Sequence, residues 1–381
     1  MKYFDRLYSS WDVPKPIIRL MQTREMVRLR EITQSVLPNC LIHNGPIPSR
    51  FQHSMGVCYL AEKVLENYLS EYGHLLPIAA LLHDAGNPPF SHLSEPFLKE
   101  VTGKDGESFL EDMLDGSETE KILIEMGLSV ELVVSWVTGK APLSDILHGS
   151  LDIDNLDNVG RFNHAANLGG PSFGAIGIAS GFRLTTEKEW VLPTVFEERV
   201  GKWLETRHKV YTSLYQEPHL NIVAMVSRAV EIAFCENEIK RDFFFLNDSQ
   251  AIEYLLHCNS RTAYLVDRAL RWNWYKEAYR FSSITVGPEE KLAKLAQRRQ
   301  SGREMAELIS RRLGIPEEKI SVLIFKGKEN RNVTIPFINK EGWKVYSGPT
   351  DMPSHRVVAY LPGDLMPEKW AVKELIESEI K

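Results

Sequence analysis

The feature that most constrains the fold is an apolar run that ends in two polar residues. Residues Ile78 to Leu82 are all apolar, and His83 and Asp84 follow them directly. A continuous apolar run predicts a helix buried on all sides, and here its last turn carries polar side chains inward. The stretch Gly86–Pro89 is expected to break the helix. A buried carboxylate is costly unless a cation or metal lies beside it, so the pair predicts a polar site inside the protein.

Most of the remaining sequence up to about residue 280 has helical periodicity. Apolar residues between Val57 and Leu69 recur at steps of three and four, which is typical of an amphipathic helix. The same analysis predicts further helices at Glu107–Leu114, Ser129–Thr138, Leu151–Ala166, Phe196–Tyr215, Leu220–Phe234, Asp248–Leu255 and Arg261–Trp272. Two short runs, Phe182–Thr186 and Trp190–Leu192, follow a glycine-rich loop and predict a β-hairpin.

The composition changes after residue 286. A helix is predicted over Glu289–Leu313, and runs rich in β-branched and aromatic residues follow it. These strand-like runs are Ile320–Phe325, Asn332–Ile338, Trp343–Tyr346 and Arg356–Leu361. The predicted fold class is therefore mostly α: a helical domain over residues 1–286 with a small β-hairpin, and a small α+β C-terminal element of unknown role over residues 287–381.

Composition sets further expectations. The 381 residues are 43% hydrophobic with a formal net charge of −6, which gives no general reason to expect nucleic-acid binding. The basic residues of the helix at Glu289–Leu313 fit a solvated face better than a nucleic-acid surface. The four cysteines are scattered without a C-x-x-C pair, and neither a signal peptide nor a run of about 20 apolar residues is seen. We therefore expect a cytoplasmic protein without a membrane span.

Three further polar groups stand in apolar surroundings. One contains His53, the second contains His92 and Glu95, and the third is the run Asp152–Asp157. A single histidine in such a setting is usually a core residue, but the adjacent pair at positions 83 and 84 makes a metal site the better interpretation. Imidazole and carboxylate ligands together suit Mn²⁺, Fe²⁺, Ni²⁺, Mg²⁺ or Zn²⁺.

These segments resemble the HD-domain phosphohydrolase superfamily. The resemblance is carried by R-F-Q-H-S-M-G at residues 50–56, L-H-D-A-G-N-P-P-F-S-H at residues 82–92 and L-D-I-D-N-L-D at residues 151–157. The sequence is most similar to the branch that contains the deoxynucleoside triphosphate triphosphohydrolases, and residues 27–30 and 207–219 also resemble it. The resemblance covers roughly residues 5–280 and implies an HD-domain helical bundle.

The resemblance implies a divalent metal site whose four ligands are His53, His83, Asp84 and Asp154. Asp154 is the middle acid of D-x-D-x-x-D, which is the ligand in the family. For Asp152 and Asp157, helix capping or ion pairing is the better interpretation, although Asp157 shares a helical face with Asp154.

The resemblance also implies the catalytic groups. A bound metal would lower the pKa of a water molecule and neutralise charge on the phosphoryl group. His92 corresponds to a general acid for the leaving group, Glu95 to its orienting carboxylate and Arg50 to a phosphate contact. The implied substrate-binding residues are Arg50, Arg207, Tyr215 and Asn87.

The sequence departs from the triphosphohydrolase pattern at several positions. Asn87 stands where that branch usually has histidine, and Gly106 stands where it supplies a second catalytic histidine. His219 lies two residues later than the family spacing from Tyr215. The positions that commonly meet the substrate carry Asn155, Asn158 and Phe162. The metal site is therefore better supported than a triphosphate substrate.

The sequence predicts an enzyme, a metal-dependent phosphohydrolase that cleaves a phosphate ester of a nucleotide or a related small molecule. One alternative is a phosphodiesterase or nuclease that acts on nucleic acid or a cyclic nucleotide. Another is a catalytically silent regulatory protein that binds metal and nucleotide. The expected partner is a phosphorylated small molecule, and a homo-oligomer is suggested only by the resemblance.

Overall fold

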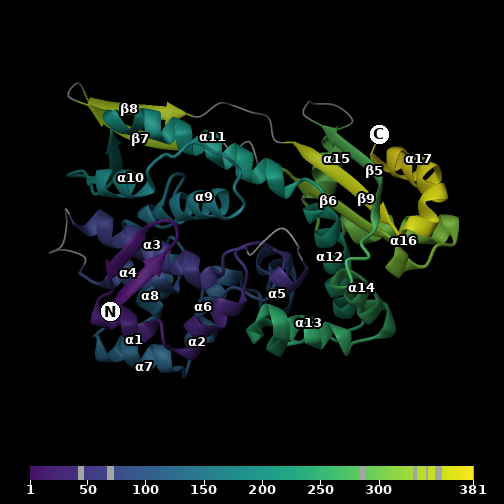
Figure 1. The fold of residues 1–381 in the computed structure, drawn as a ribbon, viewed down its shortest axis with the longest axis horizontal. Coiled ribbons are helices and arrows are strands. Elements are labelled where there is room, and N and C mark those ends of the chain that lie inside the picture. Colours follow the sequence, from purple (N-terminus) through teal and green to yellow (C-terminus); the bar gives the residue numbers. More distant parts are fainter. Residues whose placement is uncertain are drawn as a thin grey trace.

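A computed structural model describes residues 1–41, 47–66, 73–283, 289–328, 333–339, 342–347 and 354–380. Within these residues the chain is mostly helical, with a small hairpin in the middle of the sequence and a mixed α and β region near the C-terminus (Figure 1). The predicted fold class is confirmed. In the part of the chain that is described, no helix combines the length and the apolar character needed to cross a membrane.

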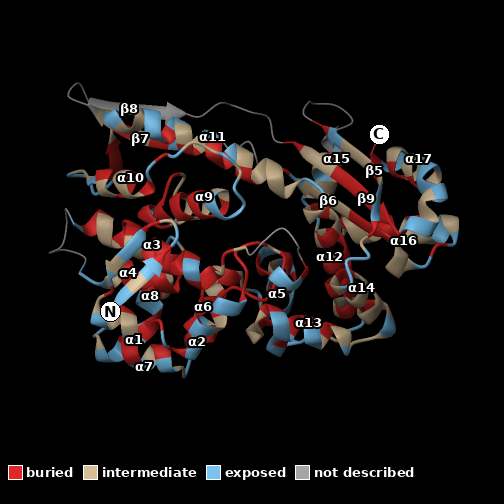
Figure 2. Ribbon diagram, in the orientation of Figure 1, coloured by how far each residue is buried: buried red, intermediate tan, exposed pale blue. Residues whose placement is uncertain are grey.

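The N-terminal half forms a helical bundle around one apolar core. Its elements are β1 (Lys2–Asp5), β2 (Ser9–Asp12), α1 (Lys15–Leu20), α2 (Arg24–Arg28), α3 (Arg50–Leu65), α4 (Leu75–Leu82), α6 (Gly106–Leu114), α7 (Glu118–Glu125), α8 (Val130–Val137), α9 (Ile153–Ala165) and α10 (Ala175–Gly181). Helix α3 packs against α4, α9 and α10 and is buried along most of its length (Figure 2). The residues of α3 are therefore well placed to carry an internal site.

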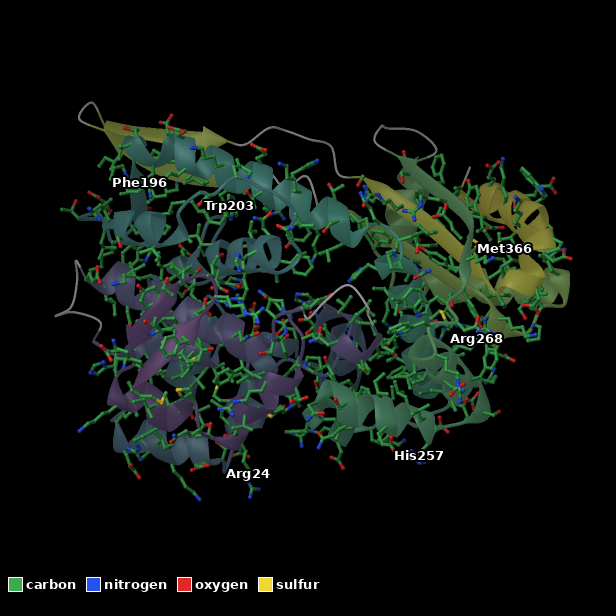
Figure 3. The ribbon with its side chains drawn as sticks, in the orientation of Figure 1. Arg24, Phe196, Trp203, His257, Arg268 and Met366 are labelled. Atoms are coloured by element: carbon green, nitrogen blue, oxygen red, sulfur yellow. The ribbon has the colours of Figure 1, made fainter. Side chains whose placement is uncertain are left out.

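A second apolar core gathers other helices. These are α5 (Glu95–Thr102), α12 (His219–Cys235), α13 (Asp248–Leu256) and α14 (Ser260–Leu270), whereas the buried apolar residues of α11 (Glu197–Leu214) belong to the first core. Trp203 of α11, labelled in Figure 3, is fully buried, and its Nε1 donates to the carbonyl oxygen of Asn155 in α9 at 3.4 Å. This contact fixes α11 against the first bundle.

Two sheets combine strands from before and after residue 286. The strands are β3 (Arg183–Leu184), β4 (Trp190–Pro193), β5 (Lys276–Ser283), β6 (Ser321–Lys326), β7 (Thr334–Asn339), β8 (Gly342–Ser347) and β9 (His355–Leu361). The predicted hairpin is β3–β4, and β7 pairs with β4 in parallel while β8 lies outside β7. In the second sheet β9 lies between β5 and β6, and both pairings are antiparallel. The predicted boundary near residue 286 falls in residues 284–288, outside the described residues.

The β5–β9–β6 sheet is covered on both faces. Helices α15 (Glu289–Ala296), α16 (Ser301–Leu313) and α17 (Lys369–Ile380) share a third core with one face. The other face packs on the second core. Successive side chains of β6 point alternately toward the second and the third core, as the pleat of a β-strand requires. Its residues Leu323 and Phe325 lie on the side of α12.

Three predicted elements differ from the structure. The single helix over Glu289–Leu313 is wrong, because the chain turns at residues 297–300 so that both α15 and α16 can pack on β6. The helix predicted to begin at Val57 begins at Arg50, and its residues 67–69 lie outside the described part. The strand expected from Asn332 begins at Thr334, and Asn332 itself is not described.

Candidate active site

Helix α3 begins at a capping box that positions two predicted site residues. Ser49 Oγ accepts from the backbone N–H of Gln52, and Gln52 Oε1 accepts from the backbone N–H of Ser49. Arg50 is therefore the first helical residue, and His53 follows one turn later on the same face. Both side chains are buried.

Helix α4 is apolar throughout, so it holds the following residues, His83 and Asp84, from a fixed position in the core. The turn after them is tied down by Arg28 of α2. Its guanidinium donates to the carbonyl oxygens of Ala85 at 3.3 Å and Asn87 at 2.6 Å. It also donates to three carbonyl oxygens just before α13, so one half-buried arginine links the turn to the second core.

Helix α9 supplies the acids. Asp152 is the N-cap, and its Oδ1 accepts from the backbone N–H of Asn155 at 2.6 Å. Asp154 lies in the first turn, where the helix dipole favours a negative charge. Asp157 is fully buried and forms two bonds of 2.8 Å with Arg161, one turn further along. The capping and ion-pairing roles that we expected for Asp152 and Asp157 are therefore present.

The three helices bring the four predicted metal ligands together. His53 Nε2 lies 2.9 Å from Asp154 Oδ1 and 3.3 Å from His83 Nε2. The same nitrogen lies 3.8 Å from Asp84 Oδ2, and His83 Nε2 lies 3.9 Å from Asp154 Oδ1. Ligand atoms of His53, His83 and Asp84 all lie within 4.8 Å of one another. Asp154 contacts both histidines but lies outside this group of three.

The outer nitrogens of both imidazoles are already engaged. His53 Nδ1 lies 2.7 Å from Asp157 Oδ1, and His83 Nδ1 lies 2.7 Å from the carbonyl oxygen of Ala80. Because both partners can only accept, we assign the ring protons to Nδ1. The Nε2 atoms then face each other and the carboxylates. This is the arrangement of metal-ligating histidines, whose other N–H is held by a carboxylate or a carbonyl.

The surroundings of the two carboxylate oxygens of Asp84 indicate whether the site fits a cation. Its Oδ1 accepts from Arg50 Nη1 at 2.7 Å and from Asn87 Nδ2 at 2.6 Å. Its Oδ2 is buried without a hydrogen-bond partner among the described residues, which is costly for a carboxylate. Burial raises the pKa of Asp84, but the charges of Arg50, His83 and His53 outweigh burial and lower it, so Asp84 is ionised. The donor set fits a divalent metal.

An ion-pair network supports His53 from the side of the N-terminal hairpin. Arg161 donates to Asp157 and also to Asp5 Oδ2 at 2.8 Å. Burial alone would raise the pKa of Asp157, but the charge of Arg161 lowers it to about 2. Burial lowers the pKa of His53, but the hydrogen bonds of the ring to Asp154 and Asp157 outweigh burial and raise the pKa to about 10. The acids around this ring therefore favour positive charge there. Sequence reasoning missed this network as a unit; the spacing of four between residues 157 and 161 was the available signal.

His92 and Glu95 line the same pocket as the predicted metal ligands. Their side chains meet with 2.9 Å between His92 Nδ1 and Glu95 Oε2. This hydrogen bond is the largest cause that lowers the pKa of Glu95 to about 2, so the carboxylate stays ionised and orients the ring. The preceding residues Phe90 and Ser91 have φ of 61° and 52°, which is uncommon for residues other than glycine. Asp248 of α13 holds this turn, since its Oδ1 accepts from the backbone N–H of Phe90 at 2.8 Å.

These residues line part of a pocket of about 370 Å³. Its polar part includes Arg50, His53, His83, Asp84, Asn87, His92, Glu95 and Asp154. Its apolar part is formed mainly by α11, α12 and β6, through Val210, Leu214, Leu220, Val223, Leu323 and Phe325. A pocket with a few convergent polar groups and apolar walls is the usual form of a small-molecule site. The contribution of β6 was not predicted.

The predicted substrate-binding residues are placed differently from one another. Arg50, Asn87 and Tyr215 line the pocket. Arg207 is buried on α11 and does not line it; its guanidinium lies 4.3 Å from the ring centre of Tyr211, which does. Asn87 is used to hold Asp84, while Tyr215 accepts a hydrogen bond at 2.8 Å from the backbone N–H of residue 328.

The positions that depart from the family pattern also have structural explanations. Gly106 packs against Asn87, and a Cβ there would lie 3.0 Å from Asn87 Oδ1, so these two residues fit each other. Asn158 and Phe162 line the pocket one and two turns after Asp154 on α9. Burial lowers the pKa of His219, another lining residue, to about 4, so its ring is neutral.

Comparisons with known proteins agree with this geometry. The model of the HD domain family matches residues 50–159, which contain all four predicted metal ligands. An uncharacterized protein of Methanocaldococcus jannaschii is 27% identical over 295 residues, which cover 75% of this chain and 61% of that protein. The deoxynucleoside triphosphate triphosphohydrolase SAMHD1 homolog of Dictyostelium discoideum is 27% identical over 185 residues, 41% of this chain and 35% of that protein. The chain thus spans less than two thirds of either relative.

A solved structure shows the same fold over almost the whole chain. A hypothetical protein from Aquifex aeolicus superposes with a TM-score of 0.74 at 21% sequence identity and covers 98% of this chain and 99% of that chain. The likeness therefore extends to the C-terminal strands and helices as well as the helical bundle. Residues 50–159 match the HD domain family, and the chain is similar to relatives that include a deoxynucleoside triphosphate triphosphohydrolase homolog.

Proposed function

We propose that this protein is a metal-dependent phosphohydrolase that cleaves a phosphate ester of a nucleotide or a related small molecule. The observation that carries the proposal is the buried Asp84 Oδ2, which accepts no hydrogen bond among the described residues and lies 3.8 Å from His53 Nε2. The Dictyostelium relative is named as a homolog of a deoxynucleoside triphosphate triphosphohydrolase, which supports a nucleotide substrate. The four free cysteines fit a reducing compartment, so we propose a cytoplasmic location.

The residues that would hold the metal are His53, His83, Asp84 and Asp154. Histidine nitrogens with carboxylate oxygens suit a first-row divalent ion, and we propose Mn²⁺, with Fe²⁺, Ni²⁺ and Mg²⁺ as the other candidates. When bound, such an ion lowers the pKa of a water molecule and offsets the negative charge of a phosphoryl group.

The remaining residues act on the phosphate ester itself. The oxygen of the attacking water forms a bond to phosphorus as the water releases one proton to solvent, and the bond between phosphorus and the ester oxygen breaks. His92 gives its proton to the leaving oxygen, and Glu95 holds the imidazole for that transfer at 2.9 Å. Arg50 lines the pocket and contacts the phosphoryl oxygens, while its bonds to Asp84 and Ser91 fix its orientation.

The test is the release of phosphate and nucleoside from a panel of esters with Mn²⁺, Fe²⁺, Ni²⁺ or Mg²⁺. The panel contains nucleoside mono-, di- and triphosphates, a cyclic nucleotide and a short oligonucleotide. We expect metal-dependent hydrolysis by the native protein and loss of at least about 10³-fold in His83→Ala and Asp84→Ala, because either change removes a ligand. Equal turnover in native and variant proteins would contradict the proposal.

A further inference from the structure

We infer that the pocket selects a phosphate monoester whose organic part is uncharged and carries an apolar ring, and that it discriminates against nucleoside triphosphates. This inference rests on the proposed function and concerns the substrate of the same site. Two features of the pocket carry it: the balance of charge among its lining residues and the chemistry of its apolar part.

The described residues that line the pocket carry more negative than positive charge. Apart from histidines, the lining acids are Asp84, Glu95, Glu107 and Asp154, and the lining cations are Arg50 and Lys328. Arg50 already shares its charge with Asp84 through a bond of 2.7 Å. A bound divalent metal offsets the charge of one phosphoryl group. Each further phosphate of a polyphosphate would face Glu95 and Glu107, and the described lining residues offer few cations to offset it.

The pocket surface on α9 changes from polar to apolar along one helical face. Asp154, Asn158 and Phe162 are spaced four residues apart and all line the pocket. Since a helix rises 1.5 Å per residue, this row extends about 12 Å from the proposed metal site. Neither an amide nor a phenyl ring can neutralise a second phosphate. These three residues of α9 therefore favour a substrate whose uncharged organic group follows the reacting phosphate directly.

The apolar part of the pocket suits a flat ring. Val210 and Leu214 come from α11, Leu220 and Val223 from α12, and Leu323 and Phe325 from β6. The ring of Phe325 lies 5.2 Å from that of Tyr215. His219 stands among these residues as a neutral imidazole, because burial lowers its pKa to about 4 and outweighs the hydrogen bond of 3.0 Å between its Nδ1 and the carbonyl oxygen of Leu214, which raises it. An apolar ring gains free energy on entering such a wall, whereas a charged group loses its hydration.

The first test compares one series of esters that differ in the number of phosphates with one pair of monoesters that differ in the organic group. Initial rates with Mn²⁺ are measured for dGMP, dGDP and dGTP, and for 1-naphthyl phosphate and glycerol 2-phosphate. We expect kcat/KM to fall by roughly tenfold with each added phosphate, and 1-naphthyl phosphate to exceed glycerol 2-phosphate by at least about tenfold. Hydrolysis of dGTP at least as fast as dGMP overturns the inference and leaves the proposed function standing. If none of the five esters is hydrolysed, the proposed function fails and the inference fails with it.

The second test changes the apolar part directly. Leu323 of β6 is partly exposed and lines the pocket, so Leu323→Asn adds a polar group there with little risk to folding. We expect the ratio of kcat/KM for 1-naphthyl phosphate to that for glycerol 2-phosphate to fall about tenfold, through KM. The matched control is Leu132→Asn on α8, where the residue is 39% exposed and does not line this pocket. An unchanged ratio in Leu323→Asn shows that β6 does not contact the organic group and overturns the inference.

Discussion

The polar and apolar parts of the pocket are built in opposite ways. The polar part uses short motifs on or beside α3, α4 and α9, and supporting residues such as Asp157 and Arg161 hold its side chains by hydrogen bonds. The apolar part joins α11, α12 and β6, so residues far apart in the sequence, such as Val210 and Phe325, share one wall.

This difference indicates where chemistry and selectivity reside. Short motifs with fixed partners set the reaction, because the atoms that carry it must be held in one geometry. Long-range packing sets the shape and polarity that a substrate meets, and these can change without disturbing the ligands. Substitutions in the polar part should therefore alter turnover or metal affinity, whereas those in the apolar part should alter stability or substrate preference.

Among substitutions that keep all four proposed ligands, the largest effect is expected from His92→Ala in the polar part. We expect kcat to fall about 10²–10³-fold with Mn²⁺ affinity retained, because the proposed general acid is lost while the proposed ligands remain. Steady-state kinetics and calorimetric Mn²⁺ titration measure the two quantities. His257→Ala after α13 is the matched control, since that histidine is exposed and its described contacts are with Glu253 of that helix. Native kcat in His92→Ala would remove His92 from the mechanism.

The substitution Asp157→Asn tests whether the hydrogen bond between Asp157 and His53 supports metal binding. Asp157 holds His53 Nδ1 at 2.7 Å, so its loss should weaken Mn²⁺ binding by roughly 10–100-fold. Calorimetric titration of protein that retains its native circular dichroism measures the change. Asp145→Asn, an exposed acid outside the network, should bind Mn²⁺ like the native protein. Unchanged affinity in Asp157→Asn would mean that the ion-pair network serves the fold alone.

The apolar part makes a prediction about pH. Burial lowers the pKa of His219 to about 4, below its ordinary value of 6.5, so the folded state binds this proton less readily than the unfolded state. Its contribution to stability is therefore complete above pH 6.5 and is lost as the pH falls toward 4. Between about pH 7 and about pH 5 the native protein should lose about 2 kcal/mol more than His219→Gln, measured by urea unfolding. If the two proteins lost the same unfolding free energy, the imidazole of His219 would have to be charged or solvated in the folded protein.

The smallest effect is expected from Asp152→Ala, which removes the cap of α9 but no proposed ligand. Its carboxylate accepts from the backbone N–H groups of Asn155 at 2.6 Å and Gly149 at 2.9 Å. Loss of such a cap costs about 1 kcal/mol of unfolding free energy. Urea unfolding measures this loss, and Mn²⁺ affinity should stay close to the native value. A large loss of Mn²⁺ affinity would show that the N-terminus of α9 depends on its cap for the position of Asp154.

The contrast between the two parts also explains what the sequence could predict. The four proposed ligands were predicted together because each stands in a local motif, and α3, α4 and α9 were predicted from periodicity. The bonds from Arg28 to the turn after α4 and from Arg161 to Asp5 were not predicted, because they join residues distant in the sequence. The break between α15 and α16 carries no glycine or proline at residues 297–300, so only the packing on β6 reveals it.

The placement of substrate-contacting residues was predicted less well than the ligands. Tyr215 and Asn87 line the pocket, but Arg207 does not, because a residue on an amphipathic helix can face either the pocket or the core with the same periodicity. The apolar residues of β6 were predicted as a strand, yet nothing local indicated that Leu323 and Phe325 would reach α12. Which face of a strand meets which partner depends on tertiary packing.

The most direct test of the central claim compares two acids of one motif, Asp154 and Asp152. Calorimetric Mn²⁺ titration is performed on the native protein, Asp154→Asn and Asp152→Asn after removal of bound metal by a chelator. Because asparagine caps a helix about as well as aspartate, Asp152→Asn should bind Mn²⁺ like the native protein. Asp154→Asn should lose more affinity than the roughly 10–100-fold typical of an orienting residue. Native affinity in Asp154→Asn, or a loss confined to Asp152→Asn, would contradict the proposed metal site.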